Sequence, residues 1–540
     1  MTEPLVQVTD LAVSFPAGDG FVRAVDGLSF ELAHGGALAL VGESGSGKST
    51  VAYGLLGLHR STGARVTGDV RVAGHDVLTA GEAELRQVRG GVAAMVFQDP
   101  LSSLDPYQAI GDQIAEVHRV HRRGTSRRAA RARAVEVLDR VGIPEAHRRA
   151  RSRPHEFSGG MRQRALIAMA LACEPRLLVA DEPTTALDVT VQAQILGLLR
   201  ELRAESGMGL ILVTHDLGVA ADSVEELLVM KDGRAVERGP VREILDAPGE
   251  DYTRDLLAAV PRINVRRPGV RPARPEGPED GALLEATGLM REFGRGKRAV
   301  TAVDQVSLTV RAGETVGVVG ESGSGKTTLG RMLVRLLEPS GGELRYQGRD
   351  IGGLTAGELR PFRSELQMVF QDPVSSLNPR RSVGESIADP LRVAGKLTDA
   401  QIVARVRELL ERVGLDPGSY DRYPHEFSGG QRQRVGIARA LAPEPKLIVC
   451  DEPVSALDVT TQAQVVKLLG ELQRDLGLAL VFIAHDLAVV RQVSDRLVVM
   501  RGGRIVEEGP ADAVYENPRH PYTRGLLAAV PRLEQEEAAA

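Results

Sequence analysis

The sequence is organised around Gly42-Glu43-Ser44-Gly45-Ser46-Gly47-Lys48-Ser49-Thr50, which fits the pattern G-x-x-x-x-G-K-[ST]. The apolar residues 37–41 before it predict a buried strand, and residues 51–58 after it predict an apolar helix. In this context the glycines let successive backbone N–H groups point into one concavity at a helix N-terminus, which predicts a phosphate cradle. Lys48 is expected to reach the β- and γ-phosphates, and the Ser49 hydroxyl to coordinate Mg²⁺. The alternative is a chance Gly/Ser turn before a helix.

The pattern occurs a second time, between residues 320 and 328, after Gly317-Val318-Val319. The residues expected to bind nucleotide are Gly42, Ser44, Gly45, Gly47, Lys48, Ser49 and Thr50 in the first loop and Gly320, Ser322, Gly323, Gly325, Lys326, Thr327 and Thr328 in the second. Other segments also recur in the same order, with small insertions in the first half. The chain is therefore a tandem duplication of one domain rather than a short-period solenoid.

Composition and charge exclude several classes of protein. The chain has 540 residues, 43% of them hydrophobic, which is ample for more than one globular core. A net charge of −5, no Trp and 3% aromatic residues argue against nucleic-acid binding. Cys173 and Cys450 lie in apolar segments and form neither a disulfide framework nor a metal pair. We see no signal peptide and no apolar run of the roughly 18 residues needed to span a bilayer, so a soluble protein is expected.

The domain organisation follows from composition. Strand-like apolar runs alternate with helical stretches in both halves, which predicts the α/β class with mainly parallel sheets. Residues 262–282 are Pro-rich and charged, as in an extended linker that serves only as a tether. The expected domains are residues 1–261 and 283–532, with a tail at 533–540. Residues 110–153 are predicted to be helical and carry an Arg-rich run, which indicates a solvated helix face or, alternatively, a surface for anionic head groups or a membrane partner.

Two carboxylates end a buried strand in each half. They are Asp181 and Glu182 in the first half and Asp451 and Glu452 in the second. Because a buried carboxylate must be paired or sit near a metal, the aspartates are expected to hold Mg²⁺ through water. The glutamates are expected to act as general bases on an attacking water. A strand that simply reaches solvent is the alternative.

A third pair of segments opens an apolar helix in each half. The residues are Ser158, Gly159 and Gly160 in the first half and Ser428, Gly429 and Gly430 in the second. A hydroxyl and bare N–H groups at a helix start make an anion site, although a capping serine is the plain alternative. One nucleotide does not need two phosphate sites in one domain. We therefore expect each segment to act across an interface, on the γ-phosphate held by the other half.

In these motifs the chain resembles the ATP-binding cassette (ABC) proteins of membrane transporters, over nearly all of both halves. The resemblance implies two tandem P-loop NTPase domains, each with a helical subdomain, that bind ATP and Mg²⁺. It identifies the Ser-Gly-Gly segments as the signature motif and implies further roles. Gln98 and Gln371 would be the Q-loop glutamines, which contact Mg²⁺ and the membrane partner, and Asp188 and Asp458 would lie in the D-loops. His215 and His485 would be the switch histidines that contact the γ-phosphate. Phe15 and Phe293 would stack on adenine, with Phe21 as an alternative in the first copy.

The ends of the domains resemble importers of oligopeptides, dipeptides and nickel. The matching segments are Asn517-Pro518-Arg519-His520-Pro521-Tyr522-Thr523-Arg524 and its counterpart around Tyr252, which lacks the His-Pro pair. The resemblance implies an ATPase on the cytoplasmic face of the plasma membrane that drives transport by two permease subunits. An extracytoplasmic solute-binding protein would deliver the solute to these permeases. No cysteine lies in this element, so the iron–sulfur cluster of some relatives is not expected.

The sequence also bears on two alternatives, a twin-cassette protein that is not a transporter and a transporter with one degenerate ATP site. Twin-cassette proteins that act on ribosomes or damaged DNA are expected to show a long charged helical insert or CxxC pairs, and this chain has neither. Met161 stands where the second copy has Gln431, which raises the question of a degenerate ATP site. We expect both sites to hydrolyse ATP, because the serine, the glycines, both glutamates and both histidines are present.

Overall fold

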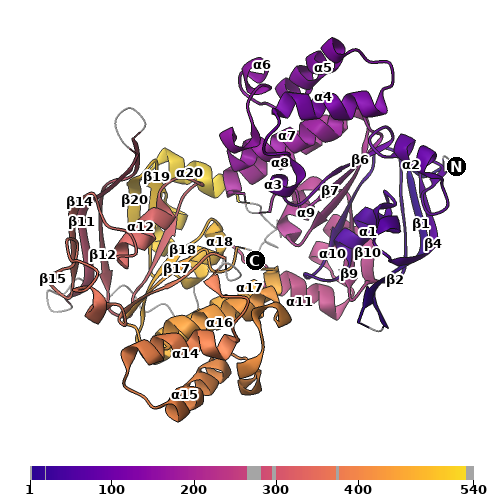
Figure 1. Ribbon diagram of the computed structural model, residues 1–540. Helices are drawn as coiled ribbons and strands as arrows, with labels where there is room; N and C mark the ends of the chain where they lie inside the picture. The colour runs from indigo at the N-terminus through magenta and orange to yellow at the C-terminus, as the bar shows by residue number, and fades with distance from the viewer. Residues whose placement is uncertain are drawn as a thin grey trace, which may run out of the picture. The chain divides into compact units, whose positions relative to one another are not determined.

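A computed structural model describes residues 3–18, 20–185, 187–263, 281–294, 299–372, 376–455 and 457–530 (Figure 1). The chain divides near residue 260 into two compact units, and each is described by itself. Most of the predicted linker, the whole of the predicted tail, and Ala186 and Ala456, the first residues of the predicted D-loops, lie outside the described residues.

The centre of the first unit is a six-stranded, mainly parallel sheet. Its strands are, in order across the sheet, β10 (Arg234–Pro240), β9 (Glu226–Lys231), β3 (Ala37–Val41), β8 (Gly209–Thr214), β7 (Leu177–Asp181) and β6 (Ala93–Val96). Only β10 runs antiparallel to its neighbour. Every residue of β3 is buried, as expected for a parallel strand that is covered on both faces.

Alternation along β3 divides its side chains between two hydrophobic cores. Leu38 and Leu40 belong to the core under the antiparallel sheet, and Ala39 and Val41 to the core under the helices. Successive side chains of a strand point to opposite faces, so one apolar run supports both layers. This burial fixes the end of β3 and with it the start of the phosphate loop.

A second, four-stranded antiparallel sheet covers one face of each unit and was not predicted. In the first unit it consists of β2 (Gly20–Leu32), β1 (Val6–Ala17), β4 (Arg65–Val72) and β5 (His75–Asp76). Its counterpart in the second unit consists of β12 (Val300–Arg311), β11 (Ala282–Phe293), β14 (Gly341–Tyr346) and β15 (Arg349–Asp350).

Helices complete the first unit, and Figure 1 shows α4, α5 and α6 as a layer set apart from the β1–β4 sheet. The helices are α1 (Lys48–Gly54), α2 (Glu82–Val88), α3 (Pro100–Ser103), α4 (Ile110–His121), α5 (Arg127–Arg140), α6 (Ala146–Arg149), α7 (Gly159–Leu171), α8 (Val189–Ser206), α9 (Leu217–Ser223), α10 (Val241–Asp246) and α11 (Asp251–Ala259). The predicted α/β class with a helical subdomain is thus confirmed.

The second unit repeats this architecture. Its six-stranded sheet has the order β16 (Leu366–Val369), β17 (Leu447–Asp451), β18 (Ala479–Ile483), β13 (Thr315–Val319), β19 (Arg496–Arg501) and β20 (Arg504–Pro510). Its helices are α12 (Lys326–Leu333), α14 (Val383–Ala394), α15 (Asp399–Arg412), α16 (Gly429–Leu441), α17 (Val459–Leu476), α18 (Leu487–Val493), α19 (Ala511–Glu516) and α20 (Pro521–Ala528).

The helix after the first phosphate loop is shorter than predicted. It was expected to run to Leu58 but ends at Gly54. Gly57 has a left-handed backbone (φ 62°), and its N–H bonds to the Gly54 carbonyl three residues earlier. A left-handed glycine cannot continue an α-helix, so the chain turns there.

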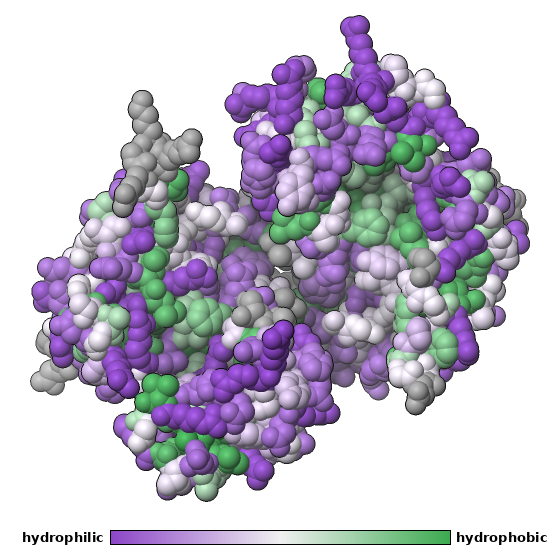
Figure 2. Space-filling model, in the orientation of Figure 1, coloured by the Kyte–Doolittle hydropathy of each residue, from purple (hydrophilic) through white to green (hydrophobic). Residues whose placement is uncertain are grey.

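The Arg-rich run lies on α4 and α5, where hydrophilic residues gather on the surface (Figure 2). Several of its arginines have partners within the unit. Arg131 pairs with Asp112, Arg133 with Glu136 and Glu174, and Arg122 donates to the Cys173 carbonyl. These contacts favour the interpretation as a solvated helix face.

Candidate active sites

The phosphate loops are shaped by backbone contacts that only glycine permits. Gly42 has φ 152°, and a Cβ there would lie 2.1 Å from the Met230 carbonyl oxygen. Gly47 has φ 98°, and a Cβ there would lie 2.4 Å from the Ala24 carbonyl oxygen. The loop is therefore pressed against both neighbouring segments. Gly320 and Gly325 repeat this geometry against Met500 and Ala302.

The loop lysines are buried and folded back on their own loops. Lys48 Nζ donates to the carbonyl oxygens of Gly42 at 2.8 Å and Glu43 at 2.7 Å. Lys326 Nζ makes the same pair of bonds, at 2.7 and 2.8 Å. Burial lowers the pKa of Lys326. Each ammonium thus sits inside its loop, bonded to backbone carbonyls that a phosphate can replace.

Each loop hydroxyl meets the aspartate at the end of the adjacent strand. Ser49 Oγ donates to Asp181 Oδ1 at 2.9 Å, and Thr327 Oγ1 donates to Asp451 Oδ1 at 2.8 Å. Burial, with the neighbouring charge of Glu182, raises the pKa of Asp181 to about 6. Burial likewise raises the pKa of Asp451. The hydroxyl and the aspartate that were predicted as magnesium ligands therefore lie together at one edge of the sheet in each half.

Glu182 receives three side-chain donors. Gln98 Nε2 and Thr185 Oγ1 donate to Oε2 at 2.7 and 2.8 Å, and His215 Nδ1 lies 3.1 Å from Oε1. Burial alone would raise the pKa of Glu182, but the hydrogen bond and charge of His215 outweigh it and leave the pKa lowered. Burial would lower the pKa of His215, but the hydrogen bond and the charge of Glu182 outweigh burial and raise this pKa.

Glu452 repeats only part of this arrangement, because its histidine contact is looser and Ser455 Oγ donates to its backbone carbonyl and not to its carboxylate. Gln371 Nε2 donates to its Oε2 at 2.7 Å, whereas His485 Nδ1 lies 3.6 Å away. Both glutamates have left-handed backbones with φ 46°, which is uncommon for a residue other than glycine. Such strain persists where the surroundings over-determine it, and it is concentrated at functional sites.

The Ser-Gly-Gly segments begin α7 and α16, as predicted. Ser158 Oγ accepts from the Met161 N–H, and Ser428 Oγ accepts from the Gln431 N–H, both at 3.3 Å. Gln431 also returns a bond, since its Oε1 accepts from the Ser428 N–H at 2.9 Å. Met161 cannot do this, so of these two helices α16 has a reciprocal capping box and α7 has not. Both serines thus cap their own helices, which is the plain alternative and is compatible with an anion site.

The remaining predicted residues are placed as follows. Phe15 is half-buried with its ring edge-on to His59, at 5.4 Å between centroids. Phe293 is 41% exposed beneath the guanidinium of Arg291. Asp458 caps α17 by accepting from the Thr461 N–H, and Asp188 immediately precedes α8. Neither the adenine-stacking role nor the D-loop role is tested by these placements.

Two kinds of contact were missed by sequence reasoning. Thr185 donates to Glu182, although its position three residues later carries no distinctive pattern. Tyr252 and Tyr522 reach the two phosphate loops from the C-terminal element of each unit. Their recurrence in a repeated Tyr-Thr-Arg segment was the available signal.

Comparison with known proteins shows the family to which the chain belongs. The ABC transporter family matches residues 25–185 and 303–455, and the family of the oligopeptide/dipeptide transporter C-terminal region matches residues 236–286 and 506–540. The chain belongs to the ABC transporter family. It is 49% identical to the glutathione import ATP-binding protein GsiA of Escherichia coli O157:H7 and 48% identical to that of strain K12, in both cases over 98% of this chain and 90% of the relative.

Among solved structures, the post-hydrolysis dimer of the ATP-binding cassette MJ0796 bound to ADP and Pi is 30% identical, with a TM-score of 0.40, and covers 42% of this chain and 98% of its own. Family and relatives together make this chain a tandem-cassette ATPase that binds ATP and is the energy-coupling subunit of an importer, which works with membrane permeases. The alternative of a non-transport twin cassette is disfavoured. In the part of the chain that the structure describes, no helix combines the length and apolar character that crossing a membrane requires.

Proposed function

We propose that this ATPase powers the uptake of glutathione or a related small peptide, at the cytoplasmic face of the membrane. The support is the identity of 49% to glutathione import ATP-binding proteins over 98% of the chain, together with the peptide-transporter C-terminal region. ATP hydrolysis would be coupled to transport through two permease subunits, and an extracytoplasmic binding protein would deliver the solute. Residues 1–261 and 283–532 are the two proposed cassettes.

The carboxylate of Glu182 is the proposed general base of the first site, and Glu452 that of the second. The observation that carries this assignment is the convergence of Gln98 and His215 on one half-buried carboxylate whose residue has a left-handed backbone. On ATP binding, Lys48 exchanges its loop carbonyls for phosphate oxygens. The lowered pKa keeps Glu182 ionised, ready to take a proton from the attacking water, while His215 holds its orientation.

The residues around Asp181 fit Mg²⁺. Asp181 Oδ2 is buried and meets no donor within hydrogen-bond geometry among the described residues, although the Tyr53 hydroxyl lies close enough to lower the pKa of this carboxyl, as the Ser49 hydroxyl does. A buried carboxylate oxygen without a well-placed donor is costly, and oxygen ligands are those that Mg²⁺ prefers. Ser49, Asp181 and Gln98, with Thr327, Asp451 and Gln371 in the second half, would hold the ion. When bound, it would neutralise charge that develops on the phosphates.

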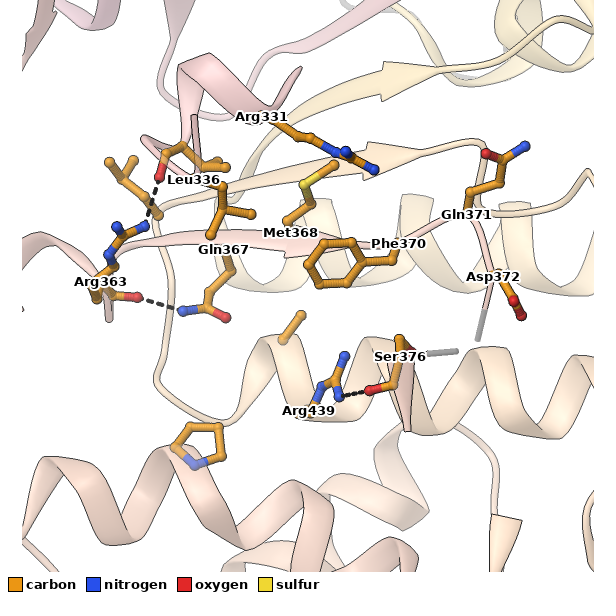
Figure 3. Close-up of a pocket in the computed structure, with 14 residues that line it drawn as sticks. Arg331, Leu336, Arg363, Gln367, Met368, Phe370, Gln371, Asp372, Ser376 and Arg439 are labelled. Atoms are coloured by element: carbon orange, nitrogen blue, oxygen red, sulfur yellow. Dashed lines mark hydrogen bonds between the residues drawn. The ribbon is translucent and has the colours of Figure 1, made fainter. Parts of the chain in front are cut away.

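A groove beside Gln371 is the proposed docking site of a permease helix. It has a volume of about 690 Å³ and an apolar floor that includes Met368 and Phe370 (Figure 3). The groove is also lined by Arg331, Arg363 and Arg439. Figure 3 shows Arg439 donating a hydrogen bond to the carbonyl of Ser376, and it shows Gln371 at one end of the groove. A helix with an apolar face and an acidic residue has the matching chemistry. Because Gln371 also donates to Glu452, an occupant of the groove lies one side chain from the proposed base.

The pairing of each phosphate loop with the Ser-Gly-Gly segment of the other half is proposed on the grounds given by the sequence. One nucleotide per domain leaves the second anion site without a use unless it serves the other half. The same holds for Asp188 and Asp458 as D-loops and for Phe15 and Phe293 as adenine-stacking residues.

The test is uptake by proteoliposomes that contain this chain with its co-purifying permeases and binding protein. Labelled glutathione, a dipeptide and Ni²⁺ are offered separately, with ATP inside. We expect ATP-dependent uptake of glutathione or the dipeptide, and no uptake by a complex that carries Glu182→Gln with Glu452→Gln. Uptake of Ni²⁺ alone would overturn the peptide assignment while leaving the ATPase assignment intact.

Phe370→Ala tests the groove. It removes the apolar floor without touching the phosphate loop, so co-purification of the permease should fall while ATP binding persists. Loss of ATP binding, or permease association equal to that of the unaltered chain, would contradict the proposed dock.

A further inference from the structure

A tyrosine from the C-terminal element of each unit contacts its phosphate loop. The Glu43 N–H donates to the hydroxyl of Tyr252 at 3.3 Å, and the Glu321 N–H donates to the hydroxyl of Tyr522 at 3.0 Å. Each tyrosine lies about two hundred residues beyond its loop in sequence, at the start of α11 or α20. The same contact occurs in both units although the flanking residues differ, as with Glu250 in one and His520 in the other.

The residue that each tyrosine contacts is also bonded, through its carbonyl oxygen, by the loop lysine. The carbonyl oxygen of Glu43 accepts from Lys48 Nζ at 2.7 Å, and that of Glu321 accepts from Lys326 Nζ at 2.8 Å. One residue is thus bonded on its N–H side by the tyrosine and on its carbonyl side by the lysine. When the lysine turns to a phosphate, the tyrosine contact stays, together with the bonds from the Ser46 N–H to the Glu43 carbonyl and from the Ser324 N–H to the Glu321 carbonyl.

The rings of both tyrosines are held by cations at the ends of sheet strands. Lys231 Nζ, at the end of β9, lies 4.5 Å from the centre of the Tyr252 ring. The Arg501 guanidinium, at the end of β19, lies 4.9 Å from that of Tyr522. These strands neighbour β3 and β13, from which the loops emerge. The hydroxyls are therefore fixed relative to the strands that carry the loops.

The backbone before each tyrosine is also fixed. Glu237 accepts from the Gly249 N–H at 2.7 Å, and Glu507 accepts from the Arg519 and His520 N–H groups at 2.7 and 3.0 Å. Figure 1 shows α20 beside β19 and β20. The element is anchored to the sheet edge independently of the loop, so it can act as a rigid support for it.

We infer that Tyr252 and Tyr522 are positioning residues of the two ATP sites. Each hydroxyl anchors the second residue of its phosphate loop, so the C-terminal element is part of the nucleotide site. The inference rests on the proposed ATP-binding role of the loops. It assigns to the peptide-importer element a task in the same polypeptide, which is to hold the loop in its phosphate-binding shape.

The test compares the full chain with Tyr252→Phe combined with Tyr522→Phe. Phenylalanine keeps the ring and its cation contact and removes only the hydroxyl. The matched control is Tyr420→Phe, which removes a hydroxyl that bonds to Glu385 at 3.0 Å in the helical subdomain. Binding of the non-hydrolysable ATP analogue AMP-PNP with Mg²⁺ is measured by calorimetry, and kcat and KM for ATP are measured by phosphate release.

The double variant should weaken AMP-PNP binding about three- to tenfold, the range that one hydrogen bond commonly provides. The KM for ATP should rise by a similar factor while kcat changes less than about twofold, since the base and its partners are untouched. Tyr420→Phe should leave both unchanged. In a Lys326→Ala background, the remaining binding should respond to Tyr252→Phe and not to Tyr522→Phe.

Unchanged affinity in the double variant would overturn the inference. So would an equal loss in Tyr420→Phe, or a loss accompanied by a thermal midpoint well below that of Tyr420→Phe, because either would reflect general loosening. Failure of the unaltered chain to bind AMP-PNP is a different result and would refute the ATP-site assignment itself.

Discussion

Replacing Glu182 or Glu452 by glutamine is the most direct perturbation of the proposed chemistry. The amide cannot take a proton from water, and general-base catalysis is commonly worth about 10²–10⁴-fold. That range corresponds to about 3–5 kcal/mol in the activation barrier. Glutamine is nearly the same size and keeps one acceptor oxygen, so ATP binding should persist.

The contacts in the structure set the cost to the fold. Three donors converge on Glu182, from Gln98, Thr185 and His215, and an amide group turns one acceptor into a donor. With the amide nitrogen in place of Oε1, one hydrogen bond is lost, that from His215, at a cost of about 1–3 kcal/mol if this donor stays buried. The opposite orientation would lose the bonds from Gln98 and Thr185. Removal of the charge also lowers the pKa of His215, because Glu182 is what raises it.

The assay is the steady-state ATPase rate of the two single variants, with permeases present. The matched control is Glu365→Gln, since that carboxylate also accepts hydrogen bonds, from Tyr346 and Lys446, outside the candidate sites. We expect each site variant to lose at least about 10²-fold in turnover while the control keeps its rate. Near-normal rates in both site variants would refute the general-base assignment.

The comparison between the two variants also bears on Met161. If Glu452→Gln left turnover near normal while Glu182→Gln abolished it, the site proposed to face Ser158 would be non-hydrolytic. The expectation that both sites turn over would then be wrong. Equal losses would show that the Met161 substitution affects the cap of α7 and not catalysis.

Lys48→Ala combined with Lys326→Ala should abolish ATP binding and hydrolysis, while circular dichroism shows a retained fold. Met161→Gln should complete a capping box on α7 as in α16 and raise the free energy of unfolding by about 0.5–1 kcal/mol in urea titrations. Glu385 is bonded by both Arg392 nitrogens at 2.6 and 2.8 Å, and these bonds, opposed by burial, lower its pKa from 4.5 to about 2. A carboxylate whose pKa is lower in the folded state stabilises the fold at pH values above its pKa in the unfolded state. Glu385→Gln should therefore lower the free energy of unfolding by about 1 kcal/mol at pH 7, after allowance for solvent screening. This difference from the unaltered chain should vanish as the pH falls from 4.5 towards 2.

Each of these expectations has a contrary outcome. ATP hydrolysis at a near-normal rate in the double lysine variant would refute the catalytic assignment of the loops. An unchanged or lower stability of Met161→Gln would show that the cap of α7 is not limited by the missing bond. A stability difference for Glu385→Gln that stays constant down to pH 2 would show that the arginine contacts do not act through its charge.

The sequence alone determined the local machinery. The glycines of the loops, the buried strand at residues 37–41, the carboxylate pairs and the Ser-Gly-Gly helix starts were all predicted in their observed elements. These features depend on interactions between residues close in sequence, and on burial patterns that repeat every two residues. The duplication helped, because each feature could be read twice in the same order.

Only the tertiary structure decided which side chains meet across long separations. Gln98 lies 84 residues from Glu182, and Glu43 lies 209 residues from Tyr252, so no local period reports either contact. The early end of α1 was missed although Gly57, a residue that commonly takes the left-handed conformation at a helix end, was a local signal for it. The antiparallel sheets were missed because pairing between β1 and β4 joins segments about sixty residues apart through backbone groups that every sequence shares.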